Sequence, residues 1–306
     1  MRGSTPALDP VPSNDHRRDR APDLHGKVCL VTGATGGIGA VAARRLAALG
    51  ATVVGVGRDA ARCEAAAAAI RAATGNPQVE FLCADLSSQA QVRTLAAAFC
   101  ARHAQLHVLL NNAGAYHFQR GTTPDGIERT FALNHLGYFL LTLLLLDRLQ
   151  ASAPARIVNV ASSAHRSANL DLADVELTVG YRGWTAYANS KLANLLFTFE
   201  LAQRLAGTGV TATAVHPGWV ATRFAENNMR GLLAMLRPFY RLYQRCTAIP
   251  PEQGADTLVW LASAPEVEGV SGKYFRDRLE REPTATALDA LLAQRLWELS
   301  ERMVAR

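Results

Sequence analysis

The fold is decided by the stretch Thr32-Gly33-Ala34-Thr35-Gly36-Gly37-Ile38-Gly39. It follows the apolar run Val28–Val31 and opens the segment Ile38–Leu49, so it predicts a strand–turn–helix unit. Residues without Cβ let the backbone of such a turn approach a pyrophosphate, and the helix N-terminus offers N–H groups and a positive dipole to phosphates. The alternative is a plain connecting turn. The position of this glycine-rich stretch, directly after the first of several strands, favours dinucleotide binding.

Apolar runs and helical segments alternate along the rest of the chain. The expected buried strands are Val28–Val31, Thr52–Val56, Val79–Cys83, His107–Leu110, Arg156–Val160 and Val210–Val215. The expected helices are Ile38–Leu49, Ala60–Ala73, Ser88–Arg102, Thr130–Leu149 and Thr185–Leu205. Gly50, Gly75 and Gly207 follow three of these helices, as C-terminal stop signals do. The pattern predicts an α/β fold of the Rossmann type: a single domain whose doubly wound parallel sheet carries helices on both faces.

The expected domain leaves out the N-terminal tail. Residues 1–25 hold four prolines, many charges and little apolar periodicity, so this tail is predicted to be disordered. Residues 26–306 are expected to form one catalytic domain. Within it, residues 221–251 alternate aromatic or aliphatic side chains with arginines. We expect a substrate lid at about 221–250, near the strand ends where open α/β sheets bind ligands.

Composition narrows the function classes and the compartment. The net charge of +6 comes without a nucleic-acid recognition motif, so no nucleic-acid partner is expected. Five cysteines occur singly, which suits a reducing compartment and predicts no metal site. The apolar run Phe139–Leu146 is too short to span a bilayer, and the N-terminus has no secretory h-region. We therefore expect a cytoplasmic protein without an integral membrane segment.

Four motifs together resemble the short-chain dehydrogenase/reductase family. They are the TGxxxGxG spacing of Thr32–Gly39, the NNAG run Asn111–Gly114, Tyr187 and Lys191 four residues apart, and Pro217-Gly218. The resemblance covers roughly Gly26 to Lys273 and implies hydride transfer between a nicotinamide cofactor and a carbonyl or alcohol carbon. It implies these cofactor-binding residues: Gly33, Thr35, Gly37, Ile38, Gly39, Arg58, Asp85, Leu86, Asn112, Ala113, Gly114, Tyr187, Lys191, Pro217, Gly218, Val220 and Thr222.

The end of the second strand predicts NADP(H) rather than NAD(H). An NAD enzyme usually places an acidic residue there, on the ribose 2′-hydroxyl. Here the position is Gly57, followed by Arg58, whose fork of donors suits a 2′-phosphate. Asp59 is the alternative ribose ligand, and we interpret it instead as the N-cap of the helix Ala60–Ala73.

Three other motifs allow a structural role beside the cofactor role. Asp85 resembles the family's adenine contact, although it could only cap the next helix. The amides of Asn111 and Asn112 are expected to brace neighbouring strands while the backbone passes the ribose. Thr222 is expected to position the nicotinamide carboxamide after the turn at Pro217 and Gly218.

The catalytic group is expected around Tyr187 and Lys191. At a spacing of four, both side chains lie on one face of a helix. A cationic lysine beside a tyrosine is expected to lower the phenol's pKa, so that it can exchange a proton with the substrate oxygen. By resemblance, Ser163, rather than Ser162, orients that oxygen, and Asn134 holds a water that relays protons from the lysine. A buried helical asparagine could instead mark a structural kink.

The substrate is expected to be bulky and apolar. Residues 134–141, 160–165 and 187–197 resemble the retinol dehydrogenase and protochlorophyllide reductase branch of the family. The alternatives are a tailoring ketoreductase of secondary metabolism and a dinucleotide sensor without chemistry. Family members commonly pair through helices beside the Tyr–Lys segment, which implies a homodimer or homotetramer.

Overall fold

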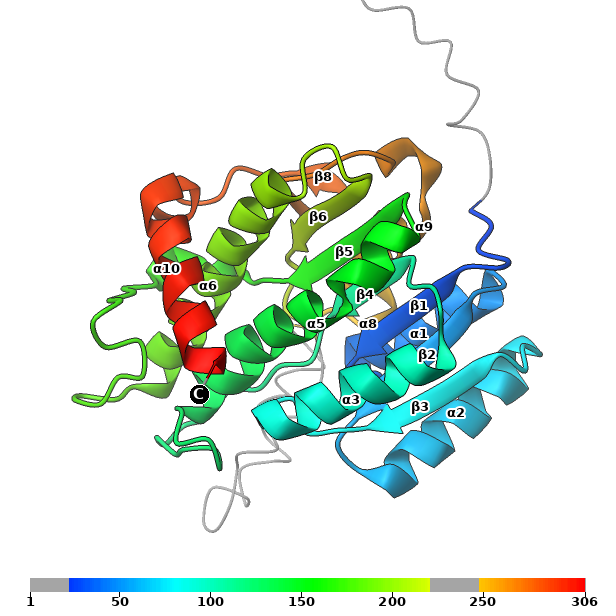
Figure 1. Cartoon of the computed structure of the whole chain (residues 1–306), viewed down its shortest axis with the longest axis horizontal. Coiled ribbons are helices and arrows are strands. Elements are labelled where there is room, and N and C mark those ends of the chain that lie inside the picture. Colours follow the sequence, from blue (N-terminus) through cyan, green and yellow to red (C-terminus); the bar gives the residue numbers. More distant parts are fainter. Residues whose placement is uncertain (1–21, 221–247, 306) are drawn as a thin grey trace, which may run out of the picture.

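The computed structural model describes residues 22–220 and 248–305, which form an α/β domain around one sheet (Figure 1). The strand order is β3-β2-β1-β4-β5-β6-β7-β8, with all pairs parallel except β7 and β8. The strands are β1 (Val28–Thr32), β2 (Thr52–Gly57), β3 (Val79–Cys83), β4 (Val108–Asn111), β5 (Ala155–Val160), β6 (Val210–Val215), β7 (Lys273–Arg276) and β8 (Leu279–Glu280). The six expected strands are confirmed within a residue of their bounds.

Helices cover both faces of the sheet, and each face has its own apolar core. The helices are α1 (Gly37–Ala48), α2 (Ala60–Thr74), α3 (Gln89–Arg102), α4 (Arg129–Phe131), α5 (Gly137–Ala151), α6 (Gly183–Arg204), α8 (Pro251–Gly254), α9 (Asp256–Ser263) and α10 (Ala290–Val304). One core joins the sheet to α3, α5, α6 and α10, and the other joins it to α1, α2 and α9. The expected doubly wound class is confirmed. Gly50, Gly75 and Gly207 all adopt positive φ beyond their helices, as stop signals should.

The direction of winding reverses between β1 and β4. From β1 the chain moves outward to β2 and β3, then crosses back to β4 on the other side of β1. The crevice at the carboxyl ends of these two strands is the topological switch point, where such sheets bind ligands. The glycine turn follows β1 and the NNAG run follows β4, so both predicted cofactor motifs meet at this crevice.

The expected helix Thr130–Leu149 is not continuous. A π-helical turn, Ala132–Leu136, separates α4 from α5. Among the described residues, one helical stretch, Arg129–Ala151, is apolar and long enough by composition to cross a membrane. Its apolar window is 72% buried inside the structure. The apolar run Phe139–Leu146 belongs to this stretch and packs in the core.

The ordered domain begins before Gly26. Leu24 is 6% exposed, and its N–H donates to the carbonyl of Leu49 at 2.9 Å. The rest of the expected tail, residues 1–21, lies outside the described residues, as does most of the expected lid, residues 221–247.

Helix α10 covers α5 and α6 on the side of the Tyr–Lys segment (Figure 1). The ring of Trp297 lies 4.9 Å from that of Phe139 on α5 and 5.8 Å from that of Phe197 on α6. His135 binds the Ser300 hydroxyl at 2.8 Å. The implied dimer or tetramer stays a prediction.

Candidate active site

The glycine turn leaves no room for side chains beside the crevice. Gly33 adopts φ +68°, and a Cβ there would lie 3.0 Å from both Ala113 and the Asn112 amide. A Cβ on Gly39 would overlap the carbonyl of Gly33. Helix α1 begins at Gly37 with no acidic residue in its first turn, so its N-terminal dipole is not offset by a carboxylate. This cradle fits the phosphates of a dinucleotide.

The NNAG run braces the strands on both sides of the crevice. The Asn112 side chain donates to the carbonyl of Thr32 at 2.8 Å, and the Thr32 hydroxyl accepts from the backbone of Asn112 and Ala113. Buried Asn111 donates to Thr142 at 3.1 Å and to Asn159 on β5 at 2.9 Å. The expected bracing role of both amides is confirmed.

The end of β2 has room only for a residue without a side chain. A Cβ on Gly57 would overlap the Thr35 side chain and approach Cys63 to 2.8 Å, so an acidic side chain does not fit there. Asp59 accepts from the backbone of Arg62 at 2.8 Å, which confirms it as the N-cap of α2. Arg58 is exposed immediately beyond Gly57.

Arg62 is a residue that the sequence analysis missed. Its guanidinium donates to the carbonyl of Thr35 at 3.4 Å, inside the glycine turn. A Cβ on Gly36 would lie 3.4 Å from that same guanidinium. The signal available was its place in the first turn of the helix that follows Arg58.

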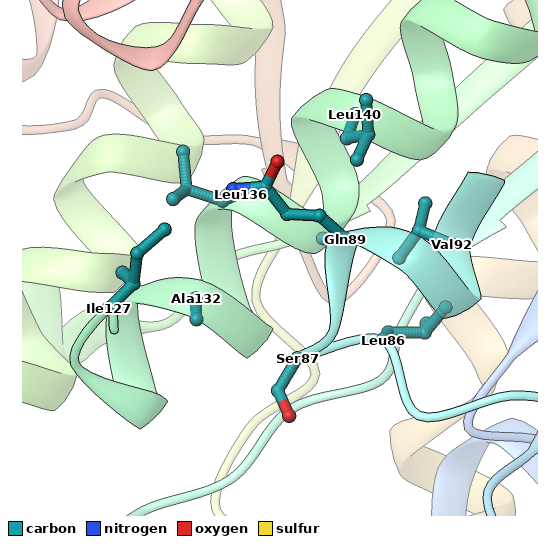
Figure 2. Close-up of a pocket in the computed structure, with 9 residues that line it drawn as sticks. Leu86, Ser87, Gln89, Val92, Ile127, Ala132, Leu136 and Leu140 are labelled. Atoms are coloured by element: carbon teal, nitrogen blue, oxygen red, sulfur yellow. The ribbon is translucent and has the colours of Figure 1, made fainter. Parts of the chain in front are cut away.

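The loop after β3 is largely committed to local contacts. Asp85 Oδ1 accepts from the backbone of Ser87 at 2.9 Å and from its hydroxyl at 2.8 Å. The Leu86 side chain lines a cavity of about 10 Å³ between α3 and α5 (Figure 2). Leu86 can therefore reach a cofactor only through its backbone. Asp85 does not cap α3, because the N-cap of this helix is Ser88 and the Asp85 carboxylate binds Ser87, outside the helix. The alternative of a helix cap is therefore wrong, and the adenine contact of Asp85 stays a prediction.

Tyr187 meets Ser162, and not the expected Ser163. The Ser162 hydroxyl forms a side-chain hydrogen bond with Tyr187 that favours the phenolate. Its oxygen accepts from the backbone of Ala164 at 3.2 Å. Ser163 is exposed and begins a 3₁₀ turn. Because neighbouring residues at a strand end point to opposite sides, only one of the two serines can face Tyr187. The choice of Ser163 is corrected to Ser162.

The environment of Tyr187 raises the pKa of its phenol. Burial is the largest cause, and the Ser162 hydrogen bond only partly offsets it. The Lys191 Nζ lies over the Tyr187 ring, 5.8 Å from its centre, and is not among the causes of the shift. The expected lowering of this pKa by Lys191 is therefore wrong for this structure. Tyr187 is protonated at neutral pH, which suits a proton donor.

Lys191 is buried between the crevice and the end of β5. It is 3% exposed, and its Nζ donates to the carbonyl of Val160 at 2.8 Å. Burial lowers the pKa of Lys191 to about 7. A Cβ on Gly114 would lie 3.7 Å from the Lys191 Nζ, which places this group beside the end of the NNAG run.

We expect the Lys191→Met variant to be more stable than the wild type, most of all at low pH. The pKa of Lys191 is about 7 in the folded chain and about 10.4 in the unfolded chain, so between these values the unfolded chain binds more protons. The wild type therefore loses free energy of unfolding by burying this charge. This loss is largest below pH 7 and becomes smaller as the pH rises. Thermal melts should show the largest gain in Tm at pH 6 and a smaller gain at pH 9. Lys273→Met, at a half-exposed lysine, is the control. A gain that does not change with pH would contradict this assignment.

Asn134 clamps the end of the NNAG run to α6. It is fully buried in the π-helical turn, donates to the carbonyl of Ala115 at 2.9 Å and accepts from the Ala115 N–H at 2.8 Å. Its amide also donates to the Ser190 hydroxyl at 3.0 Å. The alternative interpretation of Asn134, a structural kink in the helix, matches the π-helical turn. Such turns often occur at functional sites. The water relay stays a prediction.

The segment after β6 lies over the start of α1. Gly218 adopts φ +91°, and a Cβ on it would lie 2.7 Å from Ile249. Val220 pairs with Ile249, and a Cβ on Gly254 would lie 2.6 Å from Val220 and 3.4 Å from Ile38. The structure thus brings Pro217–Val220 to the glycine turn. Thr222 lies outside the described residues.

Three buried histidines surround the site without forming a metal cluster. Burial lowers the pKa of His135 to about 3 and that of His216 to about 4, so both are neutral at neutral pH. His165 binds the carbonyl of Ser162 through Nδ1 at 2.6 Å and thus helps to fix the turn that carries this serine. In residues 22–220 and 248–305, no group of three or more His, Cys, Asp or Glu side chains comes together.

Comparison with known proteins gives the family. The family model described as short chain dehydrogenase matches residues 27–232. The chain belongs to the short-chain dehydrogenase family. Retinol dehydrogenase 12 of Mus musculus is 45% identical, over 90% of this chain and 86% of its own length.

Similar solved structures agree with this family assignment. An uncharacterized protein from Mycobacterium paratuberculosis has a TM-score of 0.75 at 34% identity and covers 93% of this chain and 95% of its own. The RhlG/NADP active-site complex of Pseudomonas aeruginosa has a TM-score of 0.65 at 29% identity and covers 83% of this chain and 95% of its own.

This membership settles the reaction class. The protein is an oxidoreductase of the retinol dehydrogenase-like branch that acts on CH–OH groups, in a family that uses NAD or NADP. The Ser162–Tyr187–Lys191 group at the crevice is consistent with that class. The alternative of a dinucleotide sensor without chemistry is therefore set aside.

Proposed function

We propose that this short-chain dehydrogenase is an NADP(H)-dependent enzyme that reduces the carbonyl group of bulky hydrophobic aldehydes or ketones, and oxidises the matching alcohols. The observation that carries the proposal is the meeting of Ser162, Tyr187 and Lys191 beside Gly114, at the crevice that holds the glycine cradle. The bound nicotinamide supplies the hydride in reduction and accepts it in oxidation.

The residues of this chain divide the remaining work. In reduction, the protonated Tyr187 donates its phenol proton to the carbonyl oxygen while the carbonyl carbon receives the hydride, which yields the alcohol. Ser162 holds and polarises the same oxygen. Lys191, whose Nζ lies beside Gly114, would hold the cofactor at the ribose side of the crevice. Asn134 fixes the NNAG backbone through Ala115.

The preference for NADP(H) is supported by the shape and charge at the end of β2. Gly57 has no room for the carboxylate that an NAD enzyme uses on the ribose, and Asp59 is engaged as a helix cap. The Arg62 guanidinium contacts the glycine turn, and Arg58 is exposed directly after Gly57. Guanidinium groups bind phosphates through paired donors. The NADP complex of the Pseudomonas aeruginosa structure agrees with this choice.

We expect Arg58→Ala to weaken NADPH binding by roughly 10- to 100-fold and to change NADH binding little, because one charge-assisted contact to a phosphate is lost. Arg62→Ala should act in the same direction. Fluorescence titration with each reduced cofactor measures both affinities. Arg44→Ala, at a half-exposed arginine on α1, is the control and should change neither. Equal losses for NADPH and NADH in Arg58→Ala would refute the assignment.

The substrate class is supported by the branch to which the chain belongs and by exposed aromatic side chains at the site. Retinol, named in the relative from Mus musculus, is a large apolar alcohol. A turnover screen over short and long aldehydes and ketones, with NADPH and NADH in parallel, tests the proposal. Faster turnover of large apolar carbonyls with NADPH supports it, and preference for small or charged carbonyls contradicts it.

Location in the cytoplasm is part of the same proposal. The described cysteines, Cys29, Cys63, Cys83 and Cys100, are free thiols, and free thiols persist in reducing compartments. Fractionation of the producing cells, followed by immunodetection in the soluble and membrane fractions, tests this location.

A further inference from the structure

Two large aromatic side chains stay exposed beside the catalytic tyrosine. Trp184 is 53% exposed and Phe118 is 44% exposed. Single exposed apolar side chains are common on proteins, but aromatic groups gathered at the edge of a reaction site mark a contact surface. The arrangement of these two rings relative to Tyr187 therefore bears on how substrate is bound.

Trp184 shares one face of α6 with the catalytic pair. Residues 184, 187 and 191 are spaced by three and four, which places their side chains in one row. The Trp184 ring lies 6.1 Å from the Tyr187 ring, at an interplanar angle of 44°. Exposure falls along this row from Trp184 to partly buried Tyr187 and buried Lys191. The row leads from solvent to the reacting groups.

A second aromatic group approaches Tyr187 from the loop after β4. The Tyr116 ring meets the Tyr187 ring edge to face at 6.1 Å, and Phe118 meets Tyr116 edge to face at 4.9 Å. A Cβ on Gly183 would overlap the carbonyl of His117, so this loop packs directly on the start of α6. The close approach at Gly183 holds this loop against the start of α6, so that Tyr116 and Trp184 both contact the Tyr187 ring.

The Trp184 ring is fixed before any ligand arrives. Its Nε1–H donates to the Ser167 hydroxyl at 2.9 Å, and that hydroxyl donates to the carbonyl of Ala164 at 3.0 Å. The polar edge of the indole is thus engaged within the protein. Little side-chain freedom is left to lose on binding, so the ring offers a preorganised apolar contact.

We infer that Trp184, Tyr116 and Phe118 form an aromatic clamp that binds the apolar group attached to the reacting carbonyl. Trp184 is then the residue that sets the preference for long or ring-bearing substrates over short ones. A short aldehyde reaches Tyr187 without touching the outer ring, whereas a long one lies against it. This inference rests on the proposed function.

The test compares Trp184→Ala, Trp184→Phe and wild type on propanal and dodecanal, two aldehydes with the same reacting group. We expect Trp184→Ala to raise KM for dodecanal about tenfold, with kcat nearly unchanged, because an apolar and aromatic contact is lost. KM for propanal should not move. Trp184→Phe keeps a flat ring and should stay close to wild type. Leu291→Ala, at a similarly exposed apolar residue on α10, is the matched control.

Each outcome decides the inference. Equal KM changes for both aldehydes, or Trp184→Phe behaving like Trp184→Ala, would overturn the clamp. If wild type reduces neither aldehyde, the proposed function fails for this substrate class, and a second measurement then tests the clamp alone. In that measurement, dodecanal without reduced cofactor should quench tryptophan fluorescence in wild type and much less in Trp184→Phe. Equal quenching in both proteins would overturn the clamp independently of turnover.

Discussion

Replacing Tyr187 with phenylalanine should lower kcat for carbonyl reduction by roughly 10³-fold, because it removes the only proposed proton donor to the substrate oxygen. The ring packing against Tyr116 and Trp184 is kept, so fold and cofactor binding should be retained. Turnover is measured with NADPH and a hydrophobic aldehyde, and cofactor affinity by fluorescence titration. Turnover close to wild type in Tyr187→Phe would contradict the role of Tyr187 as the proton donor.

The matched control for this variant is Tyr138→Phe. Tyr138 also flanks Lys191, whose Nζ lies 5.7 Å from the centre of its ring, but its buried hydroxyl has no hydrogen-bond partner among the described residues. Removal of that hydroxyl should leave turnover nearly unchanged. The wild-type pH dependence gives a second check. Since the pKa of Tyr187 is raised, alcohol oxidation, which needs a proton acceptor, should speed up as the pH rises above neutrality, whereas reduction should not need alkaline conditions.

The fold was predictable where burial forces a repeating pattern. Parallel strands covered on both faces must be apolar throughout, so runs such as Val28–Val31 and Val210–Val215 are visible in the sequence. The described helices and strands after β6 were not predicted. Strand β7 has only four residues, two of them buried, and β8 has two, too few for an apolar run. Helix α10 did carry a signal, because Asp289 caps it and Leu296, Trp297 and Met303 form one apolar face.

The π-helical turn before α5 shows a different limit of prediction from the sequence. Thr130–Leu149 has uniform helical composition, but Asn134 sits where a π-helical turn inserts one residue. That turn depends on the bonds of its amide to Ala115 and Ser190, which lie 19 and 56 residues away in the sequence. Helix propensity reflects each residue and its near neighbours in the sequence, so it cannot predict a turn with such distant partners.

The motifs identify residues that the structure brings together at one crevice, but they do not determine the pKa values of these residues. The spacing of Tyr187 and Lys191 gives a shared helix face, whereas the direction of each pKa shift depends on burial. Both groups are buried enough that desolvation outweighs their neighbours. The serine was misassigned for a related reason. Ser162 and Ser163 are adjacent, and the exact point at which β5 gives way to a 3₁₀ turn decides which one faces the tyrosine.

Those two serines give the second large expected effect. Ser162→Ala should lower kcat by roughly 10²- to 10³-fold, because a preorganised donor to the developing oxyanion is lost. Ser163→Ala, one residue further along the chain, should leave kcat close to wild type because that side chain is exposed. Steady-state reduction of one hydrophobic aldehyde by NADPH compares the two variants under identical conditions.

The pH dependence separates a catalytic role of Ser162 from a structural one. The Ser162 hydrogen bond lowers the pKa of Tyr187, so its removal should raise that pKa further. The rise of alcohol oxidation with pH should therefore move to higher pH in Ser162→Ala and stay in place in Ser163→Ala. A variant that had merely lost the local turn would lose Tm without moving the pH profile. If Ser163→Ala shows the loss of kcat and the shift while Ser162→Ala does not, the geometry assigned to the end of β5 is wrong.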